Sequence, residues 1–564
     1  MFKNSCFATA MMVACLSLVA TLLAQDFSGR RGASGGDDAF GMWFSDELKE
    51  ILDDAVELNI DGVLPSYLNG NLVRLGPSQM HTDKRNYTNV LDGFGRVSKW
   101  SLDASAQRAS FQSQMIKSNV YNSSIEEEDI TAHVTQQKTE PGFSLGIPDL
   151  KNMDNTDVNL FKFDGEDTFL AFTDYATSNV IDERTLRVLG NIDNHDNDCG
   201  GDCKGASFSG SHPGEYIDKK TGKQTLVNWI GTKGLYDFEI AIYTMDDTLQ
   251  RRVIGSIKQN WMPFSIHAVA VTDKYVALVM GAVTMDFAEV GVNFCLACSS
   301  NDKLHAKDTR VYVFKLEADD ENEAPLGKNT PPIVNYNIPK EDGMFVFHYI
   351  NAFVESGKGK DGGDLLSLDV CAYDKVSPFL FGDSKSLGDY ESFMIPSKRD
   401  TMPYNCDALR RLNIDVGANK VVSWKDFPLR DDNGVEYRGE LISINKEFWG
   451  SFKSCFAYGV TYHINGSKKY EDMGIFKADL CAAQRGDFST VRLIHEAGVY
   501  TGEPIFVADP NGVDEDDGCL LIVTMDGNHL TTSLKIYDAK SLEVVATIQA
   551  PFLIPFEFHG QWIS

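Results

Sequence analysis

Positive charge is scarce in this chain of 564 residues. Its 52 lysines and arginines face 81 aspartates and glutamates, which gives a formal net charge of −29 at pH 7 and a pI near 4.7. A nucleic-acid-binding face needs a basic stripe to meet the phosphates, and the sequence contains no such stripe. We therefore exclude nucleic acid as an expected partner.

Long hydrophobic runs are absent beyond the N-terminus. Residues 1–24 combine Lys3, an apolar stretch at 6–23 and the small residue Ala24, a pattern typical of a secretory signal peptide. The same run is close to the length that spans a bilayer, so an uncleaved signal anchor stays open. We expect a signal peptide over residues 1–24, a single domain over 25–564 and a secreted or lumenal location. Sequons that agree with passage through the secretory pathway begin at Asn86, Asn122 and Asn465.

Cysteine is also sparse. Two of the 11 cysteines fall in the signal segment, which leaves nine, an odd number with at least one unpaired thiol. Cys199 and Cys203 form one close pair, and Cys295 and Cys298 form another. In a secreted chain such pairs favour local disulfides, although inert thiols and a four-thiolate zinc site remain alternatives.

Helical periodicity is scarce and is clearest at one place. In residues 44–58 apolar side chains recur at three- and four-residue steps, which predicts a helix. Elsewhere, short segments rich in β-branched and aromatic residues and bounded by Gly, Asp or Asn predict strands. Examples are 168–173, 275–280, 310–315, 365–370 and 519–524. The acidic segment 316–332, rich in Pro and Asn, is expected to be a surface loop.

A short pattern recurs between predicted strands: an Asp, polar residues, Thr or Ser, then Leu or Gly. It occurs at 181–186, 217–222, 245–249 and 537–542. The Asp side chain can accept a hydrogen bond from the backbone two residues on and so close a hairpin. Antiparallel hairpins repeated along a chain of this length favour a β-propeller, and two stacked β-sandwich domains are the alternative.

Histidine is rare enough for each of the 11 to be weighed separately. Seven lie in polar or turn-like surroundings and are expected to be solvated or locally hydrogen-bonded: His81, His133, His195, His305, His463, His495 and His529. The other four are His212, His267, His348 and His559, and the last three stand in apolar or aromatic segments, where an imidazole needs a partner. Taken singly, each of the four is more often a core histidine than a ligand. Their separations of 55, 81 and 211 residues exclude a compact zinc finger, but they allow a site assembled from several propeller blades.

At these segments the chain resembles the carotenoid cleavage oxygenase family, which includes the vertebrate retinal pigment epithelium retinoid isomerase. Segments similar to the iron-ligand motifs of the family appear in order at Ser211–Pro213, Ile266–His267, Phe345–Ala352 and Phe558–Gly560. Other segments similar to family motifs are 64–70, 74–77, 91–95, 368–374, 502–507 and 514–518. The resemblance runs from about residue 50 to the C-terminus without a large gap.

The resemblance implies an all-β fold, a seven-bladed propeller with a cap of loops and short helices over the metal face. It also implies one Fe(II) per subunit, held by the neutral imidazoles of His212, His267, His348 and His559 at the end of a hydrophobic tunnel. In this family carboxylates orient the imidazoles by accepting the ring N–H that faces away from the metal. Glu440 and Glu503 match two of these carboxylates, and the shorter Asp174 stands at the third position, where a turn-closing role is the alternative. Residues 146–151 replace a cysteine-containing segment linked to membrane attachment in vertebrate members, so that mode of anchoring is not expected.

The function implied is that of a dioxygenase that uses O2 to cleave a conjugated double bond of a carotenoid or apocarotenoid into two carbonyl products. The alternatives are a retinoid isomerohydrolase acting on retinyl esters, in which the metal is a Lewis acid, and a non-catalytic carotenoid-binding propeller. The partners expected are O2, a hydrophobic polyene and, peripherally, a membrane surface. Aromatic residues expected from adjacency to line the tunnel are Phe264, Phe347, Tyr349, Phe556 and Phe558, although core packing is an alternative role for each.

Overall fold

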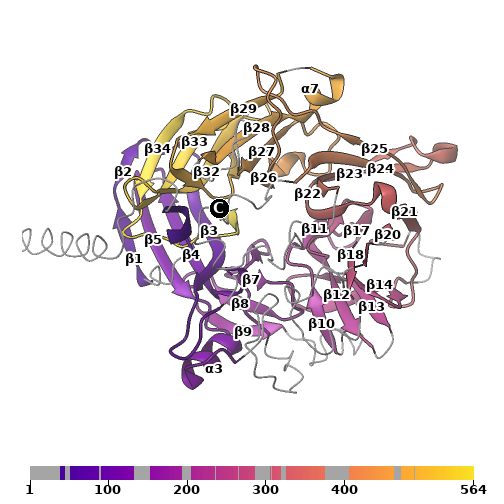
Figure 1. Cartoon of the computed structure of the whole chain (residues 1–564), viewed down its shortest axis with the longest axis horizontal. Helices are drawn as coiled ribbons and strands as arrows, with labels where there is room; N and C mark the ends of the chain where they lie inside the picture. Colours follow the sequence, from indigo (N-terminus) through magenta and orange to yellow (C-terminus); the bar gives the residue numbers. More distant parts are fainter. Residues whose placement is uncertain are drawn as a thin grey trace, which may run out of the picture.

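Antiparallel β-sheets dominate the computed structural model, and seven of them are arranged radially as the blades of a propeller (Figure 1). This is the predicted all-β fold, and the sandwich alternative is wrong. The structure describes residues 39–44, 51–87, 90–131, 153–192, 203, 205–234, 237–263, 266–281, 283–285, 305–306, 308–318, 325–374, 406–462, 472–487 and 489–564.

The first three blades come mainly from the N-terminal half of the chain. Blade 1 has the strand order β35 (His559–Ile563), β3 (Asn69–Gln79), β4 (Phe94–Asp103), β5 (Arg108–Met115) and β1 (Leu52–Leu58). Blade 2 has β6 (Asn159–Phe161), β7 (Thr168–Phe172), β8 (Ser178–Asp182) and β9 (Val188–Ile192). Blade 3 has β10 (Ala206–Ser209) and β11 (Gly214–Ile217) beside β12 (Gln224–Lys233), then β13 (Phe238–Met245) and β14 (Arg251–Gln259).

The remaining four blades follow in chain order. Blade 4 has β16 (Ala270–Val271), β17 (Tyr275–Met280), β20 (Thr309–Lys315) and β21 (Val334–Ile338). Blade 5 has β22 (Phe345–Ser356), β23 (Asp364–Tyr373), β24 (Ala408–Asp415) and β25 (Lys420–Asp426). Blade 6 has β26 (Glu440–Ser443), β27 (Phe456–Thr461), β28 (Gly474–Asp479) and β29 (Val491–His495). Blade 7 has β30 (Val499–Thr501) and β31 (Ile505–Ala508) beside β32 (Gly518–Asp526), then β33 (Thr531–Asp538), β34 (Val544–Gln549) and β2 (Ile60–Gly62).

The two ends of the described chain close the ring of blades. C-terminal β35 pairs with β3 in blade 1, and N-terminal β2 pairs with β34 in blade 7. Apolar residues of facing sheets fill the space between blades; Trp100 and Phe111 of blade 1, for example, share a core cluster with Leu521 of blade 7. A small separate sheet contains β15 (Met262–Pro263), β18 (Val283–Met285) and β19 (His305–Ala306).

The recurring Asp turns close hairpins as predicted. In the turn between β8 and β9, Asp182 Oδ1 accepts the Thr185 N–H at 2.6 Å, and Leu186 follows with a φ of 59°. The turn after β33 repeats this geometry, with Asp538 accepting the Ser541 N–H at 2.6 Å before Leu542. The repeated segment therefore encodes a left-handed turn residue at its end, which is leucine in both of these hairpins.

The helix predicted over residues 44–58 is wrong where the structure describes it. Residues 52–58 form β1, an exposed edge strand whose Val56 pairs with Phe111 of β5. Pairing with β5 of blade 1 overrides the local helical spacing, because intrinsic helix propensity is a weak preference that tertiary context outweighs. The described α-helices are short: α2 (Ala39–Met42), α3 (Asn119–Glu127) and α7 (Leu480–Arg485). None of the helices in the described ranges has the length and apolar character to span a membrane.

Part of the predicted cap is visible in α2. The Phe556 N–H donates to the Trp43 carbonyl just after α2 at 2.9 Å, and the Trp43 and Phe556 rings lie 4.9 Å apart. The predicted surface loop 316–332 falls between β20 and β21, and its described residues form no strand. Residues 1–24 and 146–151 lie outside the described residues.

One disulfide that the sequence did not suggest joins Cys455 to Cys481. Cys203 is also disulfide-bonded, whereas Cys199, Cys295 and Cys298 lie outside the described residues. Cys371, Cys406 and Cys519 are free and buried. The chain thus combines disulfides with buried thiols.

Candidate metal centre

Four histidines from four different blades meet at the centre of the propeller. His212 lies two residues before β11 in blade 3, with Pro213 between them, and His267 lies just before β16 in blade 4. His348 lies within β22 of blade 5, and His559 begins β35 of blade 1. One ligand nitrogen from each lies within 4.8 Å of the others, which is the spacing of a metal site.

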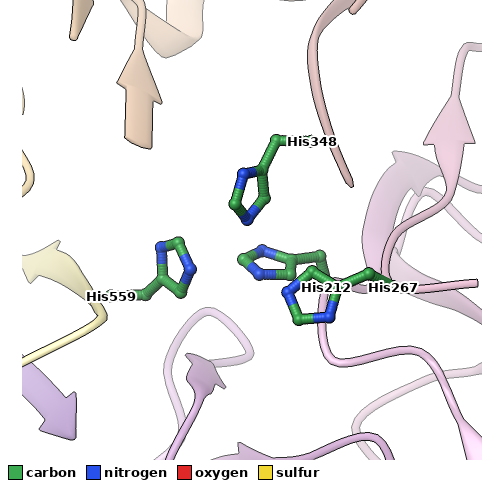
Figure 2. A group of neighbouring side chains, drawn as sticks. All are labelled: His212, His267, His348 and His559. Carbon is green, nitrogen blue, oxygen red and sulfur yellow. The ribbon is translucent and has the colours of Figure 1, made fainter. Parts of the chain in front are cut away.

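The four rings lie close together, and Figure 2 shows the ring of His212 between the other three. Its ring centroid lies 4.7 Å from that of His267, 4.8 Å from His348 and 4.3 Å from His559. The propeller thus brings together histidine side chains that are up to 347 residues apart in the sequence (559 − 212 = 347).

Backbone geometry fixes where these side chains point. The His212 N–H donates to the His267 carbonyl at 3.1 Å, so two ligand-bearing segments are joined directly. In β22 the register with β23 shifts on both sides of Tyr349, next to His348. Such irregularities are a common means of redirecting a side chain at a functional site.

The chemistry of the four imidazoles fits a divalent metal. Burial lowers the pKa of His212 well below its usual value, and the three neighbouring imidazoles lower it further. Burial also lowers the pKa of His559, and neutral imidazoles are the form that binds metal. Among the described residues, the buried Nε2 atoms of His212 and His348 have no hydrogen-bond partner. A metal at the centre would satisfy both atoms.

His348 is held by a buried carboxylate. Its Nδ1 lies 2.6 Å from Glu440 Oε2, and the Tyr373 hydroxyl donates to Glu440 Oε1 at 2.6 Å. Burial acts to raise the pKa of Glu440, but His348, Tyr373 and the Leu441 N–H together lower it below its ordinary value. Burial raises the pKa of Tyr373, so the phenol stays a proton donor.

His559 is held in the same way. Its Nδ1 lies 2.9 Å from Glu503 Oε1, while Glu503 Oε2 accepts the Gly560 N–H at 3.0 Å. Buried Arg74 lies 3.9 Å from Glu503 Oε2 and donates to the Glu503 carbonyl at 3.2 Å. Burial acts to raise the pKa of Glu503, but His559, Arg74 and Gly560 together lower it.

Asp174 makes direct contact with the third histidine, despite its shorter side chain. Its Oδ1 lies 3.0 Å from His267 Nδ1 and accepts the Ser211 hydroxyl at 2.5 Å. Its carbonyl also accepts the Ser209 N–H at 3.0 Å, so Asp174 has a role in the turn as well. Unlike Glu440, whose side chain is 6% exposed, the side chain of Asp174 is 37% exposed.

The partner of His212 was not foreseen from the sequence. Asn159, at the start of β6, places its Nδ2 3.0 Å from His212 Nδ1. Tyr373 was missed as well, although it stands in a segment that carries the family resemblance. Glu440 and Asn159 each begin the first strand of a blade, β26 and β6, and a polar residue at such a position is the signal that could have found Asn159.

The aromatic residues expected to line a tunnel occupy different surroundings. Phe347 stacks on the His267 ring with centroids 3.9 Å apart. Phe556 and partly buried Phe558 pack with the cluster that contains Trp43. Tyr349 instead packs in a core cluster of blades 4 and 5, where its hydroxyl accepts the Val279 N–H at 2.9 Å. Phe264 lies outside the described residues.

A second group of potential ligands is acidic and paired with lysines. Asp514, Asp516 and Asp517 lie together before β32. Lys540 contacts Asp514 at 2.6 Å and Asp517 at 3.0 Å, and Lys477 contacts Asp516 at 2.6 Å. These ion pairs account for the cluster without a metal.

Comparison with known proteins places these features in a family. The model of the retinal pigment epithelial membrane protein family matches residues 44–564. Mouse β,β-carotene 15,15′-dioxygenase is 25% identical to this chain, over 92% of this chain and 91% of its own length. The apocarotenoid-15,15′-oxygenase of Synechocystis is 24% identical, over 89% of this chain and 92% of its own length.

Solved structures agree in fold. A variant of Synechocystis apocarotenoid oxygenase superposes with a TM-score of 0.73 at 20% identity, covering 94% of this chain and 100% of that chain. A cobalt-substituted form of the Synechocystis protein superposes with a TM-score of 0.71 at 19% identity, covering 93% of this chain and 99% of that chain.

Proposed function

This chain belongs to the retinal pigment epithelial membrane protein family, and from that premise we propose that it is an Fe(II)-dependent dioxygenase that cleaves a carotenoid or apocarotenoid. The observation that carries the proposal is the quartet of His212, His267, His348 and His559, whose ligand atoms lie within 4.8 Å of one another. Relatives that match along most of the chain are named as carotenoid or apocarotenoid oxygenases. The reaction is the cleavage of one conjugated double bond by O2 into two carbonyl products.

Iron is the metal that suits the proposed reaction. Imidazole ligands accept iron, copper, zinc or nickel, so the donor set alone leaves the metal open. When bound, Fe(II) supplies the one-electron chemistry that lets a spin-paired polyene react with O2. The cobalt-substituted Synechocystis structure supports a metal centre in a protein with this fold.

The protein's own residues orient the ligands and exclude water. Glu440 and Glu503 accept the Nδ1–H of His348 and His559, which leaves each Nε2 lone pair free for the metal. Asp174 does the same for His267. We assign Phe347 and Phe558 to the apolar lining beside the metal, because Phe347 stacks on His267 and Phe558 is next to His559. These rings would keep bulk water from the reacting double bond.

Oxygen uptake is the test of this function. Purified protein loaded with Fe(II) is incubated with β-carotene, a series of apocarotenals and a retinyl ester, and products are identified by mass spectrometry. We expect oxygen consumption with a polyene and two carbonyl fragments whose masses sum to the substrate plus O2. Ester turnover without oxygen uptake would make the protein an isomerohydrolase, and binding without turnover would make it a carrier.

The location and domain structure are further parts of the proposal. We propose that residues 1–24 are a signal peptide and that residues 25–564 are a single secreted or lumenal domain that meets lipid surfaces peripherally to take up its substrate. The Cys455–Cys481 disulfide supports an oxidising compartment. N-terminal sequencing of the protein exported from a eukaryotic host should begin near Gln25. A protein that keeps Met1 and sediments with membranes would instead be a signal anchor.

A further inference from the structure

His212 differs from the other three histidines in the group that holds its outer nitrogen. The Nδ1 atoms of His267, His348 and His559 each face a carboxylate at 2.6–3.0 Å. The Nδ1 of His212 faces the side-chain amide of Asn159 at 3.0 Å. The centroid of the His212 ring also lies within 4.8 Å of the centroids of all three other rings.

The orientation of the Asn159 amide is set by its own backbone neighbour. Asn159 Oδ1 accepts the Leu160 N–H at 2.8 Å, which turns Nδ2 towards His212. An amide nitrogen only donates hydrogen bonds, so His212 Nδ1 accepts in this arrangement. The proton of the neutral ring is then on Nε2, the nitrogen that faces the other histidines.

Metal binding requires the opposite tautomer. When Nε2 gives its lone pair to a metal, Nδ1 must carry the proton and becomes a donor. The backbone N–H of Leu160 and the ring Nδ1–H of His212 then both need an acceptor, and the Asn159 amide has a single oxygen. A carboxylate in this place has two: Glu503 accepts His559 on Oε1 and the Gly560 N–H on Oε2.

We propose that Asn159 is the positioning residue of His212 and that its single acceptor oxygen makes His212 the most weakly held of the four ligands. The inference rests on the metal centre of the proposed function. As the metal enters, one proton leaves Nε2 and one is gained at Nδ1, so the ring stays neutral. The amide then turns its oxygen to His212 and leaves the Leu160 N–H without that acceptor.

Two substitutions at Asn159 should change metal retention in opposite directions. The protein is loaded with cobalt(II), and release to an excess of chelator is followed through the visible absorption of the bound ion. Asn159→Asp supplies a second acceptor oxygen and should slow release by about 10-fold relative to the wild type, whereas Asn159→Leu removes both hydrogen bonds and should speed it by about 10-fold. Melting of each metal-free protein shows whether the variant is folded.

Asn351 provides a matched control. Its Oδ1 accepts the N–H of the next residue, Ala352, at 2.9 Å, as Asn159 does with Leu160, but its Nδ2 donates to the Ser451 carbonyl. Asn351→Asp should therefore not slow the release of cobalt. Release from the Asn159→Asp protein at or above the wild-type rate, or equal slowing by Asn351→Asp, would overturn the inference. A wild-type protein that binds no cobalt or iron would instead reject the metal centre itself.

Discussion

The metal centre has two unlike sides. On the side of blades 5 and 1, His348 and His559 are held by Glu440 and Glu503, whose side chains are only 6% and 11% exposed. On the side of blades 3 and 4, His212 and His267 are held by Asn159 and Asp174, a neutral amide and a carboxylate that is 37% exposed. The first side is fixed mainly by buried charge.

The second side relies more on the backbone. The His212 N–H donates to the His267 carbonyl, and the Val269 N–H donates back to the His212 carbonyl at 3.3 Å. These bonds align two ligands without the help of a strong outer carboxylate. Side-chain charge and main-chain pairing can thus each orient an imidazole. We therefore expect side-chain substitutions to change metal retention by different amounts on the two sides.

Removing a ligand from the Glu-held side should have the largest effect. His348→Ala deletes one of the four donors and leaves Glu440 without the imidazole N–H that it accepts, so we expect metal retention to fall by more than about 100-fold and turnover to vanish. Metal analysis after dialysis measures the first, and product formation the second. Polyene binding, followed by the absorption shift of the carotenoid, should remain. Full metal content in the variant would remove His348 from the site.

Neutralising an outer carboxylate should come next. Glu503→Gln keeps the size of the side chain but can direct an amide N–H at His559, so we expect metal to be released about 10- to 100-fold faster. The same chelator competition used for cobalt measures the rate. Asp174→Asn, made in parallel, should have a smaller effect because the backbone also aligns His267. If Asp174→Asn were the more damaging change, the two sides would have been assigned the wrong way round.

Lengthening the carboxylate on the backbone-aligned side should help or do nothing. The longer side chain of Asp174→Glu can still reach His267 Nδ1, which the aspartate contacts at 3.0 Å, so metal retention should be kept or improved. Asp174→Ala should lose metal several-fold faster than the wild type. Equal retention in Asp174→Glu, Asp174→Ala and the wild type would reduce Asp174 to a turn residue.

The smallest effect is expected at a distance of two hydrogen bonds from the metal. Tyr373→Phe removes the hydroxyl that donates to Glu440 at 2.6 Å, while the contact between Glu440 and His348 remains. Metal release should therefore quicken by only about two- to five-fold, because the lost hydrogen bond acts on the metal only through Glu440 and His348. A change in the visible spectrum of the cobalt form would show that the effect passes through His348. An unchanged spectrum and release rate would make Tyr373 a packing residue.

Local chemistry explains which features the sequence could predict. The Asp turns were recoverable because Asp182 and Asp538 bond to backbone within three residues. The four histidines were recoverable only through motifs in their order along the chain, since each alone is more often a core residue. The helix expected over 44–58 failed because β1 pairs with residues of β5 that lie more than 50 positions further along the chain, from Leu58 with Ala109 to Leu52 with Ser113.

Contacts between blades explain what the sequence could not supply. Asn159 and His212 are 53 residues apart, and Tyr373 and Glu440 are 67 apart, so neither pair leaves a local pattern. The Cys455–Cys481 disulfide lies within blade 6, but it was missed too, because its 26-residue separation resembles no short motif. All three contacts form only because the fold brings distant parts of the chain together.

An iron titration tests the central claim most directly. Metal-free protein receives increasing Fe(II) under anaerobic conditions, and the rate of polyene cleavage is then measured in the presence of O2. The rate should rise linearly to one iron per chain and stay level beyond it, because one quartet of histidines holds one metal. Cleavage without added iron, or a break at any other ratio, would contradict a single ferrous centre at His212, His267, His348 and His559.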